Sequence, residues 1–185
     1  MTGEPKRTEV LASDAVRRAH LRRHAPAVQP LLPVELPAIL AAHGHACRGE
    51  LRELIALDRA LASDARLREF RAASAAVGRR QLSKLRPLRD QRLVQRYLRS
   101  VENAEAHGWH TLVFGVFLSQ YSLPLRQGLM LYAHRTLGGF LDSAGATLRL
   151  PVAVCDEVFT DAAAPVAGAV NGLLASQVPT MTIAK

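Results

Sequence analysis

Residues 125–148 constrain the fold more than any other part of the sequence, because they carry a long helical pattern without a proline. One face of this predicted helix carries Leu125, Leu129, Tyr132, Thr136, Phe140, Ala144 and Leu148. The other faces are also largely apolar, so we expect the helix to lie near the centre of the fold. The alternation typical of strands is not sustained anywhere along the chain, which argues against a sheet.

Shorter helical segments are predicted on both sides of this helix. An apolar segment begins at Leu31 with a proline in what would be its first turn, although Gly44 and Gly49 weaken a helix there. Ser63 and Asp64 form an N-cap signal for a following helix. The expected helices cover residues 50–62, 64–85, 89–105 and 111–120, followed by a kinked or broken helix over 156–176 around Pro165.

The chain length of 185 residues suits one domain with a hydrophobic core. Apolar residues make up 49% of the chain and aromatic residues 5%, so Leu, Ala and Val would build that core. We therefore predict an all-α fold, a single-domain bundle of about six to eight helices over residues 31–185 with no sheet. Residues 1–30 are polar and basic, with room for one short helix around residues 10–24, and their composition is compatible with disorder.

The formal net charge of +8 is concentrated in one segment. Between Arg66 and Arg99 the chain has 11 Lys or Arg residues and two acids, Glu69 and Asp90, an excess of nine positive charges. Two interpretations stay open: a solvated face of exposed helices, or a basic patch that binds an acidic protein or a nucleic acid. The arginines are expected around the helices rather than in one stripe, and no helix-turn-helix pattern is recognisable, so nucleic acid is the less favoured partner.

The sequence favours a reducing, cytoplasmic location. Its two cysteines, Cys47 and Cys155, are too few for a disulfide framework. The N-terminus MTGEPKRTEV lacks the apolar core of a signal peptide. No window reaches ~18 uninterrupted apolar residues, so neither a transmembrane span nor a membrane partner is expected.

Catalytic motifs are not found. The sequence has no G-x-x-x-x-G-K-[ST] or G-x-G-x-x-G phosphate loop, no G-x-S-x-G elbow and no H-E-x-x-H. Its acids are scattered, without a pair suited to acid–base catalysis. We therefore predict no catalytic residues, no cofactor and no enzymatic activity.

The stretch AAHGHACRGE is the one cluster of metal-ligating residue types. On a helix, His43 and Cys47 share a face, whereas His45 points about 160° away from it. At most two ligands would converge, and a metal site needs three or four. We therefore expect packing at a helix end rather than a metal site, and the same applies to His107 and His110, which flank Trp109 at a turn between helices.

Glu69, Arg71, Ser74, Gly78 and Arg79 form the pattern E-x-R-x-x-S-x-x-x-G-R. On a helix, Arg71, Ser74 and Gly78 share a face, and the small Ser and Gly would let a neighbouring helix come close. Glu69 and Arg79 would lie to the sides, where they can pair. With its surroundings, residues 50–85, this helix resembles the middle of UreF-type urease accessory proteins.

A second region, residues 110–150, resembles the same family. That family shows a His close to a V-F-G run, a short break, and a long helix that bears Tyr and ends in R-L. The matching residues here are His110, Val113, Phe114, Gly115, Tyr132, Arg149 and Leu150. A glycine inside a buried helix, as at Gly115, again indicates close packing.

The sequence departs from the family pattern in three places. The N-terminal stretch G-G-F-x-H-S-x-G-L-E is not found, PVAVCDEVF replaces a polar L-G-Q-type segment after Leu150, and the R-L-F-x-S tail is not present. The resemblance therefore indicates a shortened or divergent member.

The resemblance implies an all-α, usually dimeric accessory protein that is not an enzyme. Such a protein binds a UreD (UreH)-type partner and recruits a UreG-type GTPase, so that nickel reaches the urease apoprotein. The residues implied in the family motif or in partner binding are Glu69, Arg71, Ser74, Gly78, Arg79, Arg80, His110, Gly115, Tyr132 and Arg149.

The basic segment has two possible uses under this resemblance. Arg79, Arg80 and Arg86 would steer association if the GTPase presents an acidic surface. Alternatively, these arginines would pair with Glu50, Glu53 and Asp58 on the preceding helix. Two further functional interpretations stay open: a basic helical nucleic-acid-binding protein, whose binding would weaken steeply with salt, and a helical interaction module that is truncated, inactive or of unrelated function.

Overall fold

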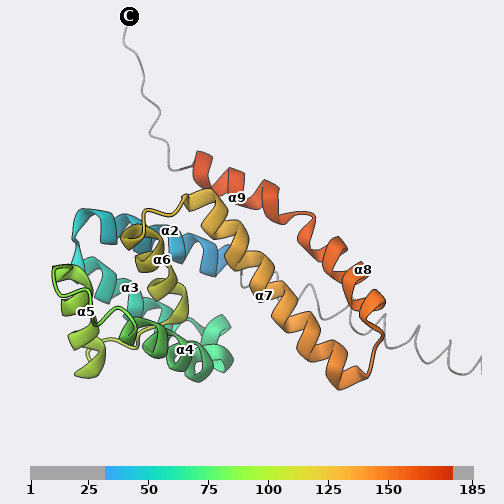
Figure 1. The fold of residues 1–185 in the computed structure, drawn as a ribbon, viewed down its shortest axis with the longest axis horizontal. Helices are drawn as coiled ribbons and strands as arrows, with labels where there is room; N and C mark the ends of the chain where they lie inside the picture. Colours follow the sequence, from blue (N-terminus) through green and yellow to red (C-terminus); the bar gives the residue numbers. More distant parts are fainter. Residues whose placement is uncertain (1–31, 177–185) are drawn as a thin grey trace, which may run out of the picture. The chain divides into compact units, whose positions relative to one another are not determined.

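The computed structural model describes residues 32–176, so the predicted N-terminal helix and the rest of residues 1–31 lie outside it. Within the described residues the chain is helical and contains no strand, which confirms the predicted all-α class. Figure 1 shows the elements in chain order: α2 (Leu32–Arg48), α3 (Leu51–Ser63), the 3-10 helix η2 (Ala65–Phe70), α4 (Arg71–Ser83), α5 (Arg92–Glu102), α6 (His110–Gln120), α7 (Leu125–Leu148), α8 (Val152–Ala163) and α9 (Val166–Ala175).

Two compact units divide the described chain, and each has its own buried side chains. The first unit comprises residues 33–129, and the second comprises Leu32 and the described residues from 130 onward. The boundary falls within α7, whose first turn belongs to the first unit. The sequence-based boundary between residues 30 and 31 lies outside the described residues and stays a prediction.

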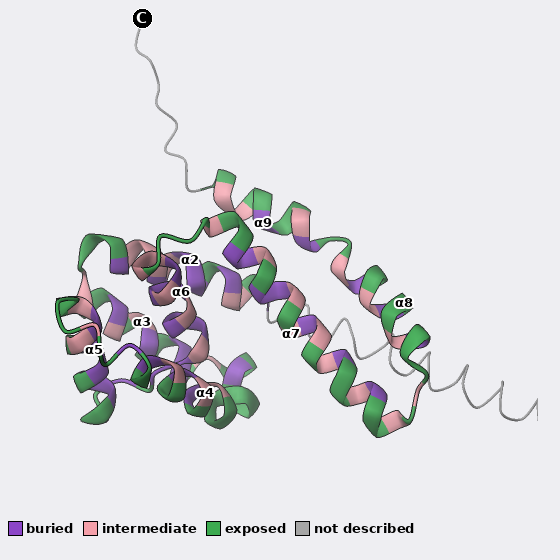
Figure 2. Ribbon diagram, viewed as in Figure 1, coloured by how far each residue is buried: buried purple, intermediate pink, exposed green. Residues whose placement is uncertain are grey.

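The core of the first unit follows the helical periodicity of its sequence. On α3, Leu54, Asp58 and Leu61 are buried at the i, i+4 and i+7 positions of one face. On α5, the buried face carries Val94, Tyr97, Leu98 and Val101. Figure 2 colours the buried residues of the helices purple and the exposed ones green. The largest side chains of this core with less than 2% exposure are Trp109, Tyr97, Ile39, Leu54, Leu67, Leu82, Leu85, Leu112, Leu118 and Leu129.

The predicted single helix over residues 64–85 is divided into η2 and α4. Asp64 is the predicted N-cap, and its side chain accepts a hydrogen bond of 2.9 Å from the backbone N–H of Arg66. The N–H of Leu67 then bonds to the carbonyl of Asp64, three residues back, which is the spacing of a 3-10 turn. The segment therefore begins with tighter winding, and the α-helix starts only at Arg71.

Helix boundaries in the second unit agree with the sequence in part, because α8 begins at Val152 and not at the predicted Asp156. The long helix α7 covers Leu125–Leu148 as predicted. The predicted break at Pro165 is confirmed, because α8 ends at Ala163 and α9 begins at Val166. The most buried side of α7 carries Leu137 and Leu141, one residue beyond the predicted Thr136 and Phe140, and its opposite side is exposed at Leu131.

One stretch of the second unit meets the length and composition of a membrane span. Across the described residues, Val152–Ala175 alone has enough mean hydropathy, and 22% of its most apolar window is buried. By this test of length and composition, the sequence-based expectation that the chain has no possible membrane span is not met. A core helix of a soluble protein passes the same test, so the stretch by itself does not establish a membrane segment.

Candidate interaction surface

The start of α6 lies directly against α4, and Gly78 makes this contact possible. A Cβ atom on Gly78 would lie 2.6 Å from the backbone nitrogen of His110 and 2.7 Å from the carbonyl carbon of Trp109, and closer still to the carbonyl oxygen of Gly108. These are backbone atoms that cannot move aside as a side chain can. The predicted close approach at Gly78 is thus an approach of backbone to backbone.

Ser74 lies one turn before Gly78 and joins the two motif regions by a hydrogen bond. Its hydroxyl oxygen accepts a bond of 3.2 Å from the backbone N–H of His110, the first residue of α6. This satisfies one of the N–H groups that a helix leaves unpaired at its start. The Nδ1 atom of His110 also lies 2.8 Å from Oε1 of Gln81, and burial lowers the pKa of this histidine.

A buried carboxylate, Asp58 on α3, holds the other side of the same turn. It accepts hydrogen bonds from the hydroxyl of Tyr97 at 2.7 Å and from the backbone N–H groups of His107 at 2.6 Å and Gly108 at 2.9 Å. Burial, followed by the nearby Asp58 carboxylate, raises the pKa of Tyr97 well above its ordinary value. The alternative in which Asp58 pairs with surface arginines is therefore wrong, because its oxygens face inward.

Gly115 has the same role against a different helix. A Cβ there would lie 2.5 Å from the carbonyl oxygen of Ile39 and 3.1 Å from the backbone nitrogen of His43, both on α2. The predicted close packing at Gly115 is confirmed. Ser74, Gly78 and Gly115 act in the structure by letting helices meet.

The remaining motif residues are placed differently. Arg71 reaches back from α4 and donates to the carbonyl oxygen of Ala62, near the end of α3. Arg79 donates to the carbonyl of Ala75 on its own helix at 3.2 Å, and among the described residues Glu69 forms no ion pair with it. Tyr132 is buried and Arg149 is exposed, and both belong to the second unit.

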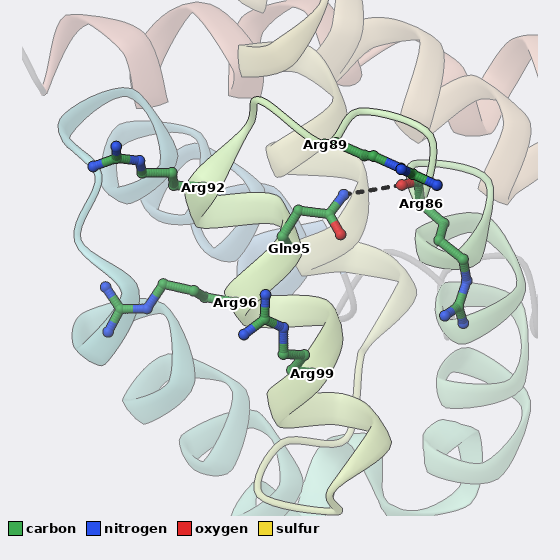
Figure 3. Close-up of a pocket in the computed structure, with 6 residues that line it drawn as sticks. All are labelled: Arg86, Arg89, Arg92, Gln95, Arg96 and Arg99. Carbon is green, nitrogen blue, oxygen red and sulfur yellow. Dashed lines mark hydrogen bonds between the residues drawn. The ribbon is translucent and has the colours of Figure 1, made fainter.

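The basic segment forms an exposed surface around α5 and the turn before it. All the Lys and Arg residues from Arg66 to Arg99 are exposed. A shallow depression of about 530 Å³ is lined by six residues, which we call the arginine groove: Arg86, Arg89, Arg92, Gln95, Arg96 and Arg99. Figure 3 shows Gln95 in the middle, with arginines of α5 and of the preceding turn around it.

On α5 the sequence-based expectation about charge distribution is wrong. Arg92, Arg96 and Arg99 occupy the i, i+4 and i+7 positions and form a stripe opposite the buried face. Around α4 the arginines are spread, as expected. A second expectation also fails, because Arg86 pairs with Glu102 of α5 at 2.5 Å rather than with an acid of α3.

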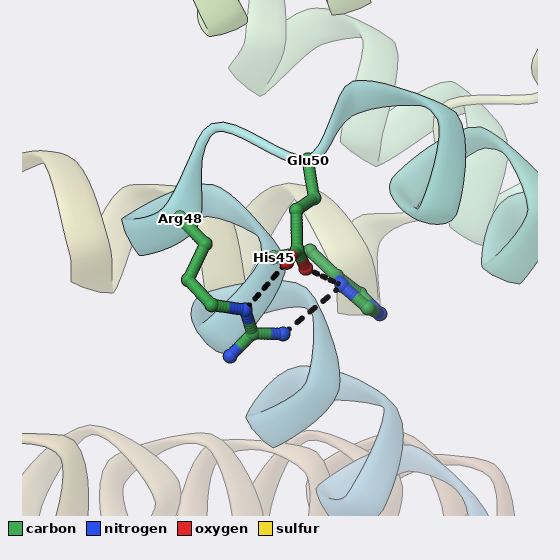
Figure 4. Close-up of polar contacts among 3 residues, drawn as sticks. All are labelled: His45, Arg48 and Glu50. Carbon is green, nitrogen blue, oxygen red and sulfur yellow. Dashed lines mark hydrogen bonds and ion pairs between the residues drawn. The ribbon is translucent and has the colours of Figure 1, made fainter.

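The His–Cys stretch at the end of α2 is divided between two small networks. Figure 4 shows Glu50 accepting from Arg48 Nε at 2.8 Å and lying 2.8 Å from Nδ1 of His45. The Arg48 guanidinium, with His45, holds the pKa of Glu50 at about 2. On another face, the Cys47 sulfur lies 3.8 Å from the His43 ring and 3.3 Å from the Ser119 hydroxyl. The stretch therefore splits as predicted, with two of its three residues on one face.

Two features of the site were missed by the sequence interpretation. The first is buried Asp58, which stands on the same helical face as the apolar Leu54 and Leu61. An acid inside an apolar stripe is a signal of a buried carboxylate that needs donors. The second is the stripe of Arg92, Arg96 and Arg99, whose spacing was visible in the sequence. In residues 32–176, no group of three or more His, Cys, Asp or Glu side chains has a geometry that could hold a metal ion.

A comparison with protein families gives a match for this chain. A model of the UreF family matches residues 18–150, which is more than half of the chain. The matched range includes the whole first unit and all of α7. Among curated proteins, no sequence matches the chain.

Proposed function

Because this chain belongs to the UreF family of urease accessory proteins, we propose that it is a scaffold that binds a UreD (UreH)-type protein and recruits a UreG-type GTPase. The family is one of accessory proteins rather than known enzymes. In this proposal the GTP chemistry belongs to the GTPase, and nickel is the cargo that the assembly delivers to the urease apoprotein.

The family match over residues 18–150 is the observation that carries the proposal. The junction between α4 and α6 supports it, because residues of the two motif regions meet there: Ser74 and Gly78 come from the first region and His110 from the second. These residues would keep the scaffold in shape. Partner contacts would then be made by exposed motif residues, namely Glu69, Arg79 and Arg80.

We also propose that the chain works as a homodimer in a reducing cytoplasm. Family membership supports the dimer. The location is supported by the two cysteines, Cys47 and Cys155, which are both free thiols.

Co-expression tests the scaffold directly. The chain is produced with the UreD-type protein of the same source, the UreG-type GTPase is added, and the mixture is separated by size-exclusion chromatography. Co-elution of all three proteins, followed by urease activation, is the expected result. If the folded chain elutes alone in every combination, the partner assignment is wrong while the fold remains.

A double charge reversal tests recruitment of the GTPase. Arg79 and Arg80 are exposed on α4, and neither forms an ion pair within residues 32–176. Arg79→Glu with Arg80→Glu should slow association, most strongly at low salt, because exposed charges act mainly on the encounter rate. Matched reversals at Arg52 and Arg135, two exposed arginines elsewhere, serve as the control. Equal association of the two variants with the GTPase contradicts the assignment.

A further inference from the structure

The residues of the arginine groove are not part of the family motif. Its residues lie on α5 and on the turn between α4 and α5, outside the E-x-R-x-x-S-x-x-x-G-R helix. The turn is held to α5 by Gln95, whose amide nitrogen donates to the carbonyl oxygens of Arg86 at 3.1 Å and Leu88 at 2.9 Å. This bonding fixes the backbone that carries Arg86 and Arg89 beside the arginine stripe of α5 (Figure 3).

The charges of the groove are largely uncompensated. Arg86 pairs with Glu102, but within residues 32–176 no carboxylate lies within 4.0 Å of a nitrogen of Arg89, Arg92, Arg96 or Arg99. Arg92 and Arg96 are an i, i+4 pair of like charge, which is unfavourable on an isolated helix. A bound anion would relieve this repulsion, and no group of residues 32–176 does so.

The lining of the groove indicates what kind of anion it takes. It consists of five arginines and Gln95, with no aromatic side chain on which a nucleobase could stack. The Gln95 amide nitrogen is engaged by backbone carbonyls and is not free to read a base edge. The depression is open and contains no glycine-rich loop that could surround a triphosphate. Recognition would therefore rest on guanidinium forks, which match carboxylates in a planar, bidentate geometry.

We propose that the arginine groove binds an acidic polypeptide segment of a partner protein through Arg89, Arg92, Arg96 and Arg99. Because Arg92, Arg96 and Arg99 lie at the i, i+4 and i+7 positions of one helical face, their positive charges can pair with a run of Asp and Glu side chains on the partner. The proposal rests on the proposed function only in expecting the partner among proteins of urease maturation. The proposed binding of carboxylates itself rests only on the residues that line the groove.

A labelled deca-glutamate peptide tests the proposal by fluorescence anisotropy with the full chain at about 0.15 M salt. The groove variant is Arg92→Gln, Arg96→Gln and Arg99→Gln. The control variant is Arg52→Gln, Arg68→Gln and Arg135→Gln, which makes the same charge change at exposed arginines that do not line the groove. Circular dichroism shows that both variants are folded. The groove variant should bind the peptide about tenfold more weakly, and the control should stay within about twofold of the unchanged chain.

Three results would overturn the proposal. Equal weakening in both variants would mean that the peptide senses only net charge. No saturable peptide binding by the unchanged chain would remove the ligand class. Tighter binding of a single-stranded DNA of equal charge, lost in the groove variant, would assign the groove to nucleic acid. If the chain binds the peptide but does not co-elute with the accessory proteins, this inference stands and the proposed function is wrong. If the chain co-elutes with them but does not bind the peptide, the proposed function stands and this inference is wrong.

Discussion

The junction between α4 and α6 and the arginine groove lie in the same unit, yet they depend on opposite physical chemistry. At the junction, Gly78 has no room for a single additional carbon, and Ser74 and Asp58 satisfy backbone N–H groups of the adjoining turn. In the groove, four exposed arginines have no carboxylate partner within the described residues. Close-packed contacts such as those at the junction determine how helices are arranged, whereas exposed charges without a partner can bind a ligand of opposite charge.

This difference separates two roles within one sequence motif. In this chain, Ser74 and Gly78 of the motif form a packed junction, as their contacts show. Arg79, one residue after Gly78, is exposed, and its side chain donates a hydrogen bond to a carbonyl of its own helix. Substitutions at the two kinds of site should therefore have different consequences, one for stability and the other for binding.

The largest effect is expected from Gly78→Ala. The new methyl group would meet backbone atoms of residues 108–110, so helix α6 or the turn before it must shift. We expect a loss of about 3 kcal/mol in the free energy of unfolding, measured by urea denaturation. Gly44→Ala is the matched control, because a Cβ there would meet only the flexible end of Arg48. The control should be neutral or gain up to about 1 kcal/mol. Similar losses in both variants would show that α4 does not depend on close approach at residue 78.

A smaller loss is expected from Asp58→Asn. Both carboxylate oxygens accept from donors, so the amide group of Asn must place its own N–H₂ against one of them. One buried donor is then left without an acceptor, which costs about 2 kcal/mol. Tyr97→Phe removes one donor and leaves the carboxylate its backbone partners, so we expect about 1 kcal/mol from the same urea measurement. If Asp58→Asn is no worse than Tyr97→Phe, the carboxylate is not what holds the turn.

The helices of this chain were predictable because each has a strong local signal. Apolar spacing alone placed α7 at Leu125–Leu148, and Pro165 marked the break between α8 and α9. The N-cap at Asp64 was predicted, but the division of residues 64–85 into η2 and α4 was not, because it depends on an i+3 backbone bond that periodicity does not register. Similarly, α5 begins at Arg92 and ends at Glu102, whereas the pattern extended over 89–105.

The candidate site was predictable in part. Small residues at Ser74, Gly78 and Gly115 indicated close packing, and their spacing sufficed for that inference. The identity of the facing element could not be read from the sequence, because Gly78 meets residues 108–110, about thirty positions away. The buried role of Asp58 was not predicted for the same reason: its donors, including Tyr97 and Gly108, come from distant parts of the chain.

A modest pH dependence is expected from His110. Burial lowers its pKa in the folded chain, so the unfolded chain binds this proton more readily as the pH falls below about 6.5. The contribution of His110 to stability is complete above that pH and is lost as the pH falls through the lowered pKa. His110→Asn keeps a donor near the position of Nδ1, opposite Gln81, and removes the titration. Its unfolding free energy should therefore change less between pH 7 and pH 5 than that of the unchanged chain. Parallel profiles would exclude a titration at His110.

The smallest effect on stability is expected in the groove, and it sharpens the comparison most. Arg92→Gln, Arg96→Gln and Arg99→Gln remove exposed charges that have no carboxylate partner in residues 32–176, so the summed change in unfolding free energy should stay within about 0.5 kcal/mol. A slight gain is consistent with relief of like-charge repulsion along α5. A loss above about 1 kcal/mol would mean that the arginine stems pack on the core and that the groove is structural, as the junction is. A variant that keeps its stability and loses an acidic ligand would instead show that these arginines are present for binding.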